Sequence, residues 1–96
     1  MQKAEIKQEA DVIVVAGTLD FSNVMDLYAQ SLAMLEKSNK LSFDFSQVQS
    51  GGSAALALIL EWMKYAKKNN KSIQIKQLSP ELTSLARVAG VDQLLN

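Results

Sequence analysis

The stretch of this sequence best suited to chemistry is "DFSQVQSGGSAALALIL" at residues 44–60, where Ser53 follows two glycines and opens an apolar segment. A serine hydroxyl becomes a nucleophile when a neighbouring base, usually histidine, removes its proton. The chain has no histidine and no cysteine. These absences exclude Ser-His and Cys-His nucleophiles, disulfides, and the His and Cys ligands of most zinc sites. We therefore expect a protein that is not an enzyme and that has no catalytic residue, no metal site and no cofactor.

Three structural or binding roles remain for Ser53. In the first, Gly51 and Gly52 give the backbone freedom for a tight strand-to-helix turn, and the Ser53 hydroxyl accepts a hydrogen bond from an amide of the first helical turn. In the second, the helix start attracts an anion such as phosphate, although the GxxxxGK[ST] pattern of nucleotide loops is missing. In the third, Ser53 is an exposed docking or phosphorylation residue, at which added charge would alter partner affinity. The capping and docking roles are compatible.

The size and charge of the chain limit the classes of partner. Ninety-six residues are enough for one domain, which we expect to span residues 1–96. Ten basic and ten acidic residues cancel, which removes the electrostatic basis for broad nucleic-acid binding or adsorption to an anionic membrane. No apolar run reaches the roughly 18 residues of a membrane span, and the charged amino terminus does not resemble a signal peptide. We expect a cytoplasmic protein that neither binds nucleic acid nor inserts into a membrane.

Hydrophobic periodicity divides the chain into alternating strands and helices. Two β-rich pieces in residues 4–19 predict a hairpin whose second strand ends at Gly17. Further elements follow from the spacing of apolar residues and from capping signals: a helix at 22–38 capped by Ser22 or Asn23, a strand at 41–45, a helix from Ser53 to Lys68, a strand at 72–78, and a helix that begins with Ser79 and Pro80 and ends at Gly90. The expected fold is α/β, with a mostly parallel sheet of about four to five strands, an amino-terminal hairpin and about three helices packed mainly on one side.

The helix expected from Ser53 to Lys68 has an unusual outer face. At about 100° per residue, the face toward the sheet should carry Ala55, Ile59, Trp62 and Ala66, and the outer face Ser53, Ala57, Lys64 and Lys68. Leu60 falls among the lysines, with Leu56 and Met63 at the edge. Apolar patches rimmed by polar residues often mark binding sites, although these leucines could instead form a margin of the core. We predict a partner-binding surface made of Gly52, Ser53, Leu56, Ala57, Leu60 and Lys64.

Two other groups of charged residues favour structural roles. A basic run suits the dipole at the carboxyl end of a helix and keeps the helix soluble; its members are Lys64, Lys67, Lys68 and Lys71. Asp20 and Asp44 could converge at the ends of strands. Isolated carboxylates more often cap turns than catalyse, so we expect turn-capping from this pair.

The segment "FDFSQVQSGGSAALALIL", residues 43–60, resembles the signature of STAS domains, the family of sulfate-transporter tails and anti-sigma-factor antagonists. In that family a strand ending in Asp-Leu-Ser leads to a helix opened by Asp-Ser/Thr-Ser/Ala-Gly-Leu. Asp44 and Ser46 match the strand end, Ser53 takes the Ser/Thr position and Leu56 the leucine position. The likeness covers nearly the whole chain, from "GTLDF" to "LARVAGVDQLL". Within the family it is greatest to the small cytoplasmic STAS subunit of Mla-type phospholipid ABC transporters.

This resemblance implies a non-catalytic subunit that binds and supports the ATPase of an Mla-type ABC transporter through the helix after Ser53. The transporter's role would be phospholipid traffic that maintains outer-membrane lipid asymmetry, and the partner would hold the chain at the inner membrane. The alternative is an anti-sigma-factor antagonist that binds a serine kinase and is regulated by phosphorylation of Ser53. Gly52 replaces the acid that the family carries next to the phosphorylated serine, and Ala55 replaces its glycine. The missing acid argues against phosphorylation and affects docking less.

Overall fold

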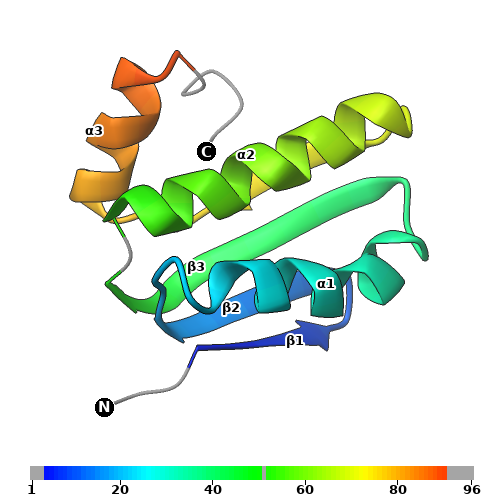
Figure 1. Cartoon of the computed structure of the whole chain (residues 1–96). Helices are drawn as coiled ribbons and strands as arrows, with labels where there is room; N and C mark the ends of the chain where they lie inside the picture. The colour runs from blue at the N-terminus through cyan, green and yellow to red at the C-terminus, as the bar shows by residue number, and fades with distance from the viewer. Residues whose placement is uncertain (1–3, 51, 91–96) are drawn as a thin grey trace.

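The structure, a computed structural model, describes residues 4–50 and 52–90. Within these ranges strands and helices follow in the predicted order (Figure 1). The strands are β1 (Glu5–Glu9), β2 (Val12–Thr18), β3 (Lys40–Ser50) and β4 (Ser72–Lys76), and the helices are α1 (Val24–Leu35), α2 (Gly52–Lys68) and α3 (Pro80–Val88). The α/β fold expected from the alternating periods is confirmed.

The described strands form one sheet in the order β1-β2-β3-β4. β1 and β2 pair antiparallel as the predicted hairpin, with Glu9 opposite Val12 at the turn. β2 pairs parallel with β3, and β3 pairs parallel with β4. Each parallel pair is connected through a helix, because parallel strands need a crossover connection. The prediction of a mostly parallel sheet led by a hairpin is therefore confirmed.

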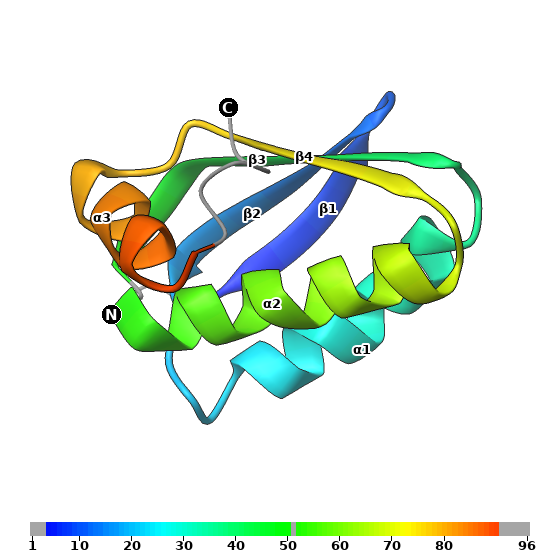
Figure 2. The same ribbon diagram turned by 90° about the horizontal axis from the view of Figure 1, so that it is seen from above.

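Helices α1 and α2 lie along the same face of the sheet, and α3 lies beside the start of α2 (Figures 1 and 2). The core fills the space between this helical layer and the sheet. Its fully enclosed side chains come from both layers and include Val15, Leu27, Leu35, Phe43, Leu58 and Ile75. The one-sided packing of the helices is as predicted.

Trp62 lies at the centre of this core. Its side chain is fully buried, and its ring stacks on Phe43 with the ring centroids 4.0 Å apart and an interplanar angle of 19°. Phe45 meets the same ring edge-on at 6.2 Å. Stacked and edge-on contacts are the favourable geometries for aromatic pairs. β3 thus presents two aromatic side chains to α2 and fixes the rotation of that helix about its axis.

Three strand ends differ from the sequence prediction. β4 ends at Lys76, two residues before the predicted end at residue 78. β3 is longer than the strand predicted at 41–45, because its second half pairs again with β2 beyond a register shift, where Gln47 lies opposite Ala16. The prediction that Gly17 ends β2 is wrong. Gly17 lies inside the strand with a φ of +94°, and β2 continues to Thr18. A residue without a Cβ permits this irregular backbone, since bulges often require a left-handed conformation.

A hydrogen-bonded turn before α1 replaces the predicted side-chain cap. Asn23 stands at the N-cap position, yet neither it nor Ser22 caps the helix. Instead, Oδ1 of Asp20 accepts hydrogen bonds from the amides of Ser22 at 2.9 Å and Asn23 at 3.1 Å. The Ser22 hydroxyl also donates to this oxygen. These bonds lower the pKa of Asp20, the Ser22 hydroxyl bond most of all.

The cap predicted for the last helix is confirmed, whereas the turn predicted at Asp44 is not. Oδ1 of Asp44 accepts a 2.7 Å hydrogen bond from the amide of Ser46. Both residues lie inside β3, next to its register shift with β2, so the turn-capping role predicted for Asp44 is wrong. Ser79 caps α3 by accepting from the Leu82 amide at 3.1 Å, and Pro80 takes the first helical position. Proline suits that position because its missing N–H would have no intrahelical partner there.

Candidate functional site

The inner face of α2 is the one that the helical periodicity predicts. Ala55, Ile59, Trp62 and Ala66 are all buried. Ala54 and Leu58 are buried as well, which widens the apolar face beyond the predicted stripe. The rotation of α2 about its axis is therefore confirmed, and with it the identity of the outer face.

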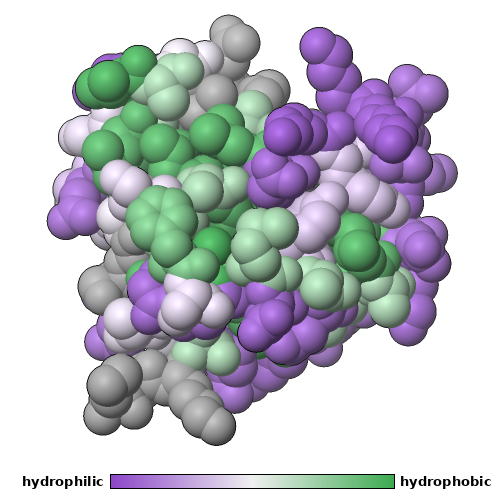
Figure 3. All heavy atoms as spheres, viewed as in Figure 1, coloured by the Kyte–Doolittle hydropathy of each residue, from purple (hydrophilic) through white to green (hydrophobic). Residues whose placement is uncertain are grey.

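The outer face of α2 carries a small apolar surface made of Leu56, Ala57 and Leu60, which we call the α2 patch. All three side chains are partly exposed. They belong neither to the buried core cluster nor to the partly buried residues packed against it. Met63 differs, because it packs against the core. In Figure 3, hydrophobic side chains gather over the first half of α2 and the neighbouring α3. Apolar atoms outside the core are available for contact with another molecule.

Ser53 lies in the first turn of α2 and is exposed. Since α2 begins at Gly52, Ser53 lies inside the helix instead of at its cap position. Its hydroxyl makes no hydrogen bond within residues 4–50 and 52–90. Among the described residues Ser53 therefore does not cap α2, so the capping role, one of the three considered for it, is wrong. The docking role of this exposed side chain stays a prediction.

Gly52 has a φ of +46°, a backbone conformation that side chains with a Cβ rarely adopt. A Cβ at this position would lie 3.5 Å from Oε1 of Glu81, at the start of α3. The carboxylate of Glu81 thus stands close to the start of α2, where the family carries an acid in sequence. Gly51, the other glycine of the predicted turn, lies outside the described residues.

The charges on α2 are partly neutralised. Lys64 Nζ lies 2.9 Å from Oε2 of Glu61, and this bond raises the pKa of the lysine. The pair is exposed at the lysine end, where water screens it, so its contribution to stability is small. It borders the α2 patch with one positive and one negative charge.

Lysines near the carboxyl end of α2 have the structural role that the sequence predicts. Lys67 and Lys68 lie in the last turn of α2, where positive charge suits the helix dipole. Lys71 Nζ donates to the carbonyl oxygen of Leu35, the last residue of α1, and lies 5.4 Å from the ring centroid of Tyr65. Lys71 therefore satisfies a terminal carbonyl of α1, a contact that its sequence neighbours do not reveal.

Sequence reasoning missed three exposed large apolar residues, Phe21, Met25 and Val88. Their exposed fractions are 69%, 60% and 88%. Phe21 lies in the turn organised by Asp20, and Met25 lies in the first turn of α1. Met25 falls outside the apolar stripe of α1. This position in the helical spacing could have indicated that its side chain is exposed. The starts of α1 and α2 lie at the same end of the molecule, beyond the carboxyl ends of β2 and β3 (Figure 1).

Neither a metal cluster nor a membrane span is found in the described part of the chain. No group of three or more Asp, Glu, His or Cys side chains within it could hold a metal ion. None of its helices has the length and hydropathy needed to cross a bilayer.

A hairpin followed by parallel strands, with the helices on one face and an exposed serine opening the second helix, is the architecture of a STAS domain. The chain belongs to this family: the family model described as "Mlab, STAS domain" matches residues 3–96. No curated protein matches the chain by sequence.

Solved structures support the same fold at low sequence identity. A chain of the Acinetobacter MlaFEDB complex, in an ATP-bound conformation, matches with a TM-score of 0.79 and 22% identity, covering 96% of this chain and 98% of that one. The Bacillus cell-fate determinant SpoIIAA in its phosphorylated form gives 0.73 and 16%, covering 98% and 89%. An anti-sigma factor antagonist from Mycobacterium paratuberculosis gives 0.73 and 19%, covering 99% and 83%. At these identities the likeness concerns the fold.

Proposed function

We propose that this protein is a non-catalytic STAS subunit that binds and supports the ATPase of an Mla-type ABC transporter. The transporter would move phospholipid and so maintain the lipid asymmetry of the outer membrane. The chain would act on the cytoplasmic side of the inner membrane, held there by its partner. Membership of the family and the fold shared with the Acinetobacter MlaFEDB chain support this proposal.

The observation that carries the proposal is the α2 patch beside Ser53. Leu56, Ala57 and Leu60 are partly exposed and lie outside the core, on the helix that follows the family's Ser/Thr position. Burying partly exposed leucines against a partner contributes roughly 25 cal/mol per Å² of apolar surface removed from water. The partner-binding surface consists of Gly52, Ser53, Leu56, Ala57, Leu60 and Lys64. Its centre is apolar and its rim polar, which is the usual arrangement of a protein interface.

A second function deserves a test because Ser53 is exposed in the first turn of α2. A kinase could reach its hydroxyl, and the chain would then act as an anti-sigma-factor antagonist that phosphorylation switches. Two features of the chain argue against this function. Gly52 lacks the acid of the switchable relatives, and Glu81 already places a carboxylate near the start of α2. A phosphate on Ser53 would be repelled by that carboxylate.

The two functions predict different partners in the native cell. We expect affinity purification of the tagged chain in mild detergent to recover an ATP-binding-cassette ATPase in stoichiometric amount. Leu60→Asp should lose this ATPase, because it would bury an unpaired charge in the interface. Ala29→Asp is the matched control, since Ala29 is an exposed residue of α1 and its variant should retain the ATPase. Recovery of a serine kinase, with most of the chain phosphorylated at Ser53, would overturn the transporter proposal.

A further inference from the structure

The two edges of the sheet differ in how well they are protected from another strand. β1 carries Glu5, Lys7 and Glu9 among its five residues, and Lys7 pairs with Glu9 at 3.1 Å. Charged residues on an edge strand discourage further pairing. β4, the opposite edge, reads Ser-Ile-Gln-Ile-Lys and has one charge, Lys76, at its end. Among the described strands, β4 is therefore the edge that is less protected from pairing with another strand.

The backbone of β4 offers hydrogen-bonding groups on its outer side. The amide of Ser72 donates to the carbonyl oxygen of Asn39 at 3.0 Å, so Ser72 directs its backbone groups toward β3. Alternate residues of a strand direct these groups to opposite sides. The N–H and C=O groups of Ile73 and Ile75 consequently point outward, and within the described residues β4 pairs only with β3.

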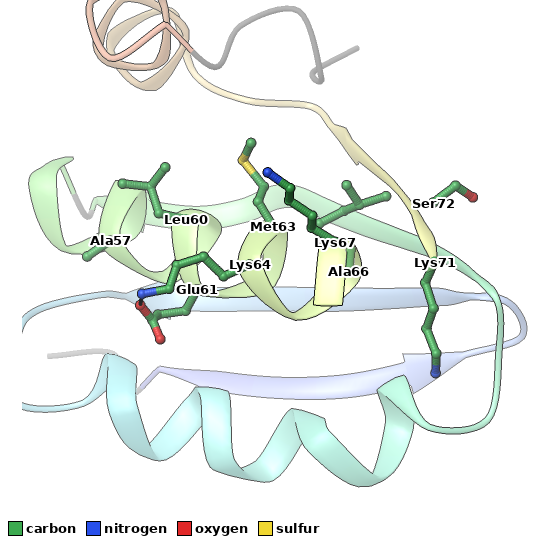
Figure 4. Close-up of a pocket in the computed structure, with 10 residues that line it drawn as sticks. Ala57, Leu60, Glu61, Met63, Lys64, Ala66, Lys67, Lys71 and Ser72 are labelled. Carbon is green, nitrogen blue, oxygen red and sulfur yellow. Dashed lines mark hydrogen bonds and ion pairs between the residues drawn. The ribbon is translucent and has the colours of Figure 1, made fainter. Parts of the chain in front are cut away.

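An apolar groove runs beside this edge, between β4 and the outer flank of α2. It has a volume of about 830 Å³ and is lined by Leu60 and Met63 of α2 and by Ile73 of β4, among others. In Figure 4, Leu60 and Met63 extend from α2 toward the same side as Lys67, whereas Lys64 and Glu61 pair on the other flank. Its lining combines the flank of a helix with the start of an edge strand, an arrangement that suits an extended protein segment.

The rim of the groove is positively charged. Lys64, Lys67 and Lys71 all line it. Lys64 is paired with Glu61, and Lys71 donates to the carbonyl of Leu35. Lys67 has no such partner within residues 4–50 and 52–90, so it remains available to an incoming carboxylate.

We propose that β4 and this groove bind an extended partner segment that alternates acidic and apolar residues and adds to the sheet as a further strand beside β4. The outward backbone groups of Ile73 and Ile75 supply main-chain hydrogen bonds, as in other strand additions. Strands lie about 4.8 Å apart and alternate their side chains. Apolar side chains of the segment therefore enter the groove over Leu60 and Met63, and an acidic side chain approaches Lys67. This inference goes beyond the proposed function, because it does not depend on which protein supplies the segment.

The test uses the full chain and two blocked hexapeptides, Glu-Val-Glu-Val-Glu-Val and Lys-Val-Lys-Val-Lys-Val. We expect the acidic peptide to bind more tightly and to slow the hydrogen exchange of the Ile73 and Ile75 amides, measured by NMR. Lys67→Glu should weaken its binding roughly fivefold to tenfold by replacing an attraction with a repulsion. Lys68→Glu is the matched control, because it makes the same charge change one residue away, outside the groove lining.

Several outcomes would overturn the inference. These are equal binding of the two peptides, equal effects of the two lysine variants, and protection of β1 amides in place of β4 amides. Dodecanoate serves as a third probe. Shifts of Leu60 and Met63 signals by dodecanoate, with no peptide binding, would assign the groove to an anionic lipid and overturn the strand addition. Because Leu60 lines the groove, Leu60→Asp should also weaken peptide binding, and undiminished protection of Ile75 in that variant would overturn the strand addition even if ATPase binding were lost.

Discussion

The indole Nε1 of Trp62 donates a 2.9 Å hydrogen bond to the hydroxyl oxygen of Ser31. Ser31 is fully buried on α1, and its hydroxyl donates in turn to the carbonyl oxygen of Tyr28 at 2.6 Å. The indole nitrogen, the one polar atom of the Trp62 side chain, therefore has a hydrogen-bond partner on the neighbouring helix α1. This bond joins α1 to α2 at a defined point and complements the aromatic contacts of Trp62 with β3.

Replacing Ser31 by alanine should destabilise the fold. The variant leaves the buried indole N–H without a partner, which costs about 1 to 3 kcal/mol of unfolding free energy. Urea denaturation of the wild type and of Ser31→Ala measures the difference. Ser84→Ala is the control, because Ser84 is exposed on α3 and should change the free energy by less than about 0.5 kcal/mol. Equal losses in both variants would show that the Ser31 bond contributes nothing.

Replacing Trp62 by alanine should cost more, because it removes a fully buried side chain and leaves a cavity beside Phe43. Such changes cost about 3 to 5 kcal/mol, a large part of the roughly 5 to 10 kcal/mol expected for a domain of this size. We expect the native protein to emit tryptophan fluorescence at short wavelength and Trp62→Ala to unfold at much lower urea concentration. A red-shifted native spectrum would contradict the burial of Trp62.

Substitutions at Ser53 should affect partner binding and leave the fold intact. Ser53 is exposed and makes no hydrogen bond within the described ranges, so Ser53→Ala and Ser53→Glu should each change stability by less than about 0.5 kcal/mol. Ser53→Glu should weaken binding to the partner ATPase more than about tenfold, because its charge must be desolvated in the interface. Ser53→Ala should weaken it less.

The control for this charge is Ser84→Glu, which adds the same carboxylate to an exposed position of α3. Thermal midpoints and titration calorimetry with the purified ATPase separate folding from binding. If Ser84→Glu weakened binding as much as Ser53→Glu, net charge would explain the effect. If neither variant weakened binding, Ser53 would lie outside the interface.

Acid should weaken the turn before α1. Hydrogen bonds lower the pKa of Asp20 in the folded state below its ordinary value of 3.8. A carboxyl with a lowered folded pKa contributes stability above its unfolded pKa and loses it as pH falls through the folded pKa. The thermal midpoint of Asp20→Asn should therefore lie below that of the wild type at pH 7, and the gap should narrow below about pH 4. A gap that stayed constant down to pH 2 would show that the charge of Asp20 is unimportant.

The sequence predicts the fold well because its periodic signals are strong. The spacing of Ala55, Ile59 and Trp62 gives the rotation of α2, and the alternation of Leu41, Phe43 and Phe45 gives the buried face of β3. Strand ends are less predictable. They depend on partners distant in sequence, as in the renewed pairing of β3 with β2 beyond the register shift.

The candidate site is only partly predictable from the sequence. Its central residue, Leu60, follows from helical spacing, and so does the exposure of Ser53. The contact of Lys71 with the carbonyl of Leu35 and the position of Glu81 near Gly52 could not be predicted. They join residues 36 and 29 positions apart, and no local pattern reports which helix ends come together in the folded chain.

The closeness of Gly52 and Glu81 has an evolutionary consequence. An acid at position 52 would adopt an unfavourable left-handed backbone and would place a second carboxylate beside Oε1 of Glu81. We therefore expect the two positions to be coupled: an acid at position 52 should destabilise the chain less when residue 81 carries no charge. On this argument, sequences of this family should rarely combine acids at both positions.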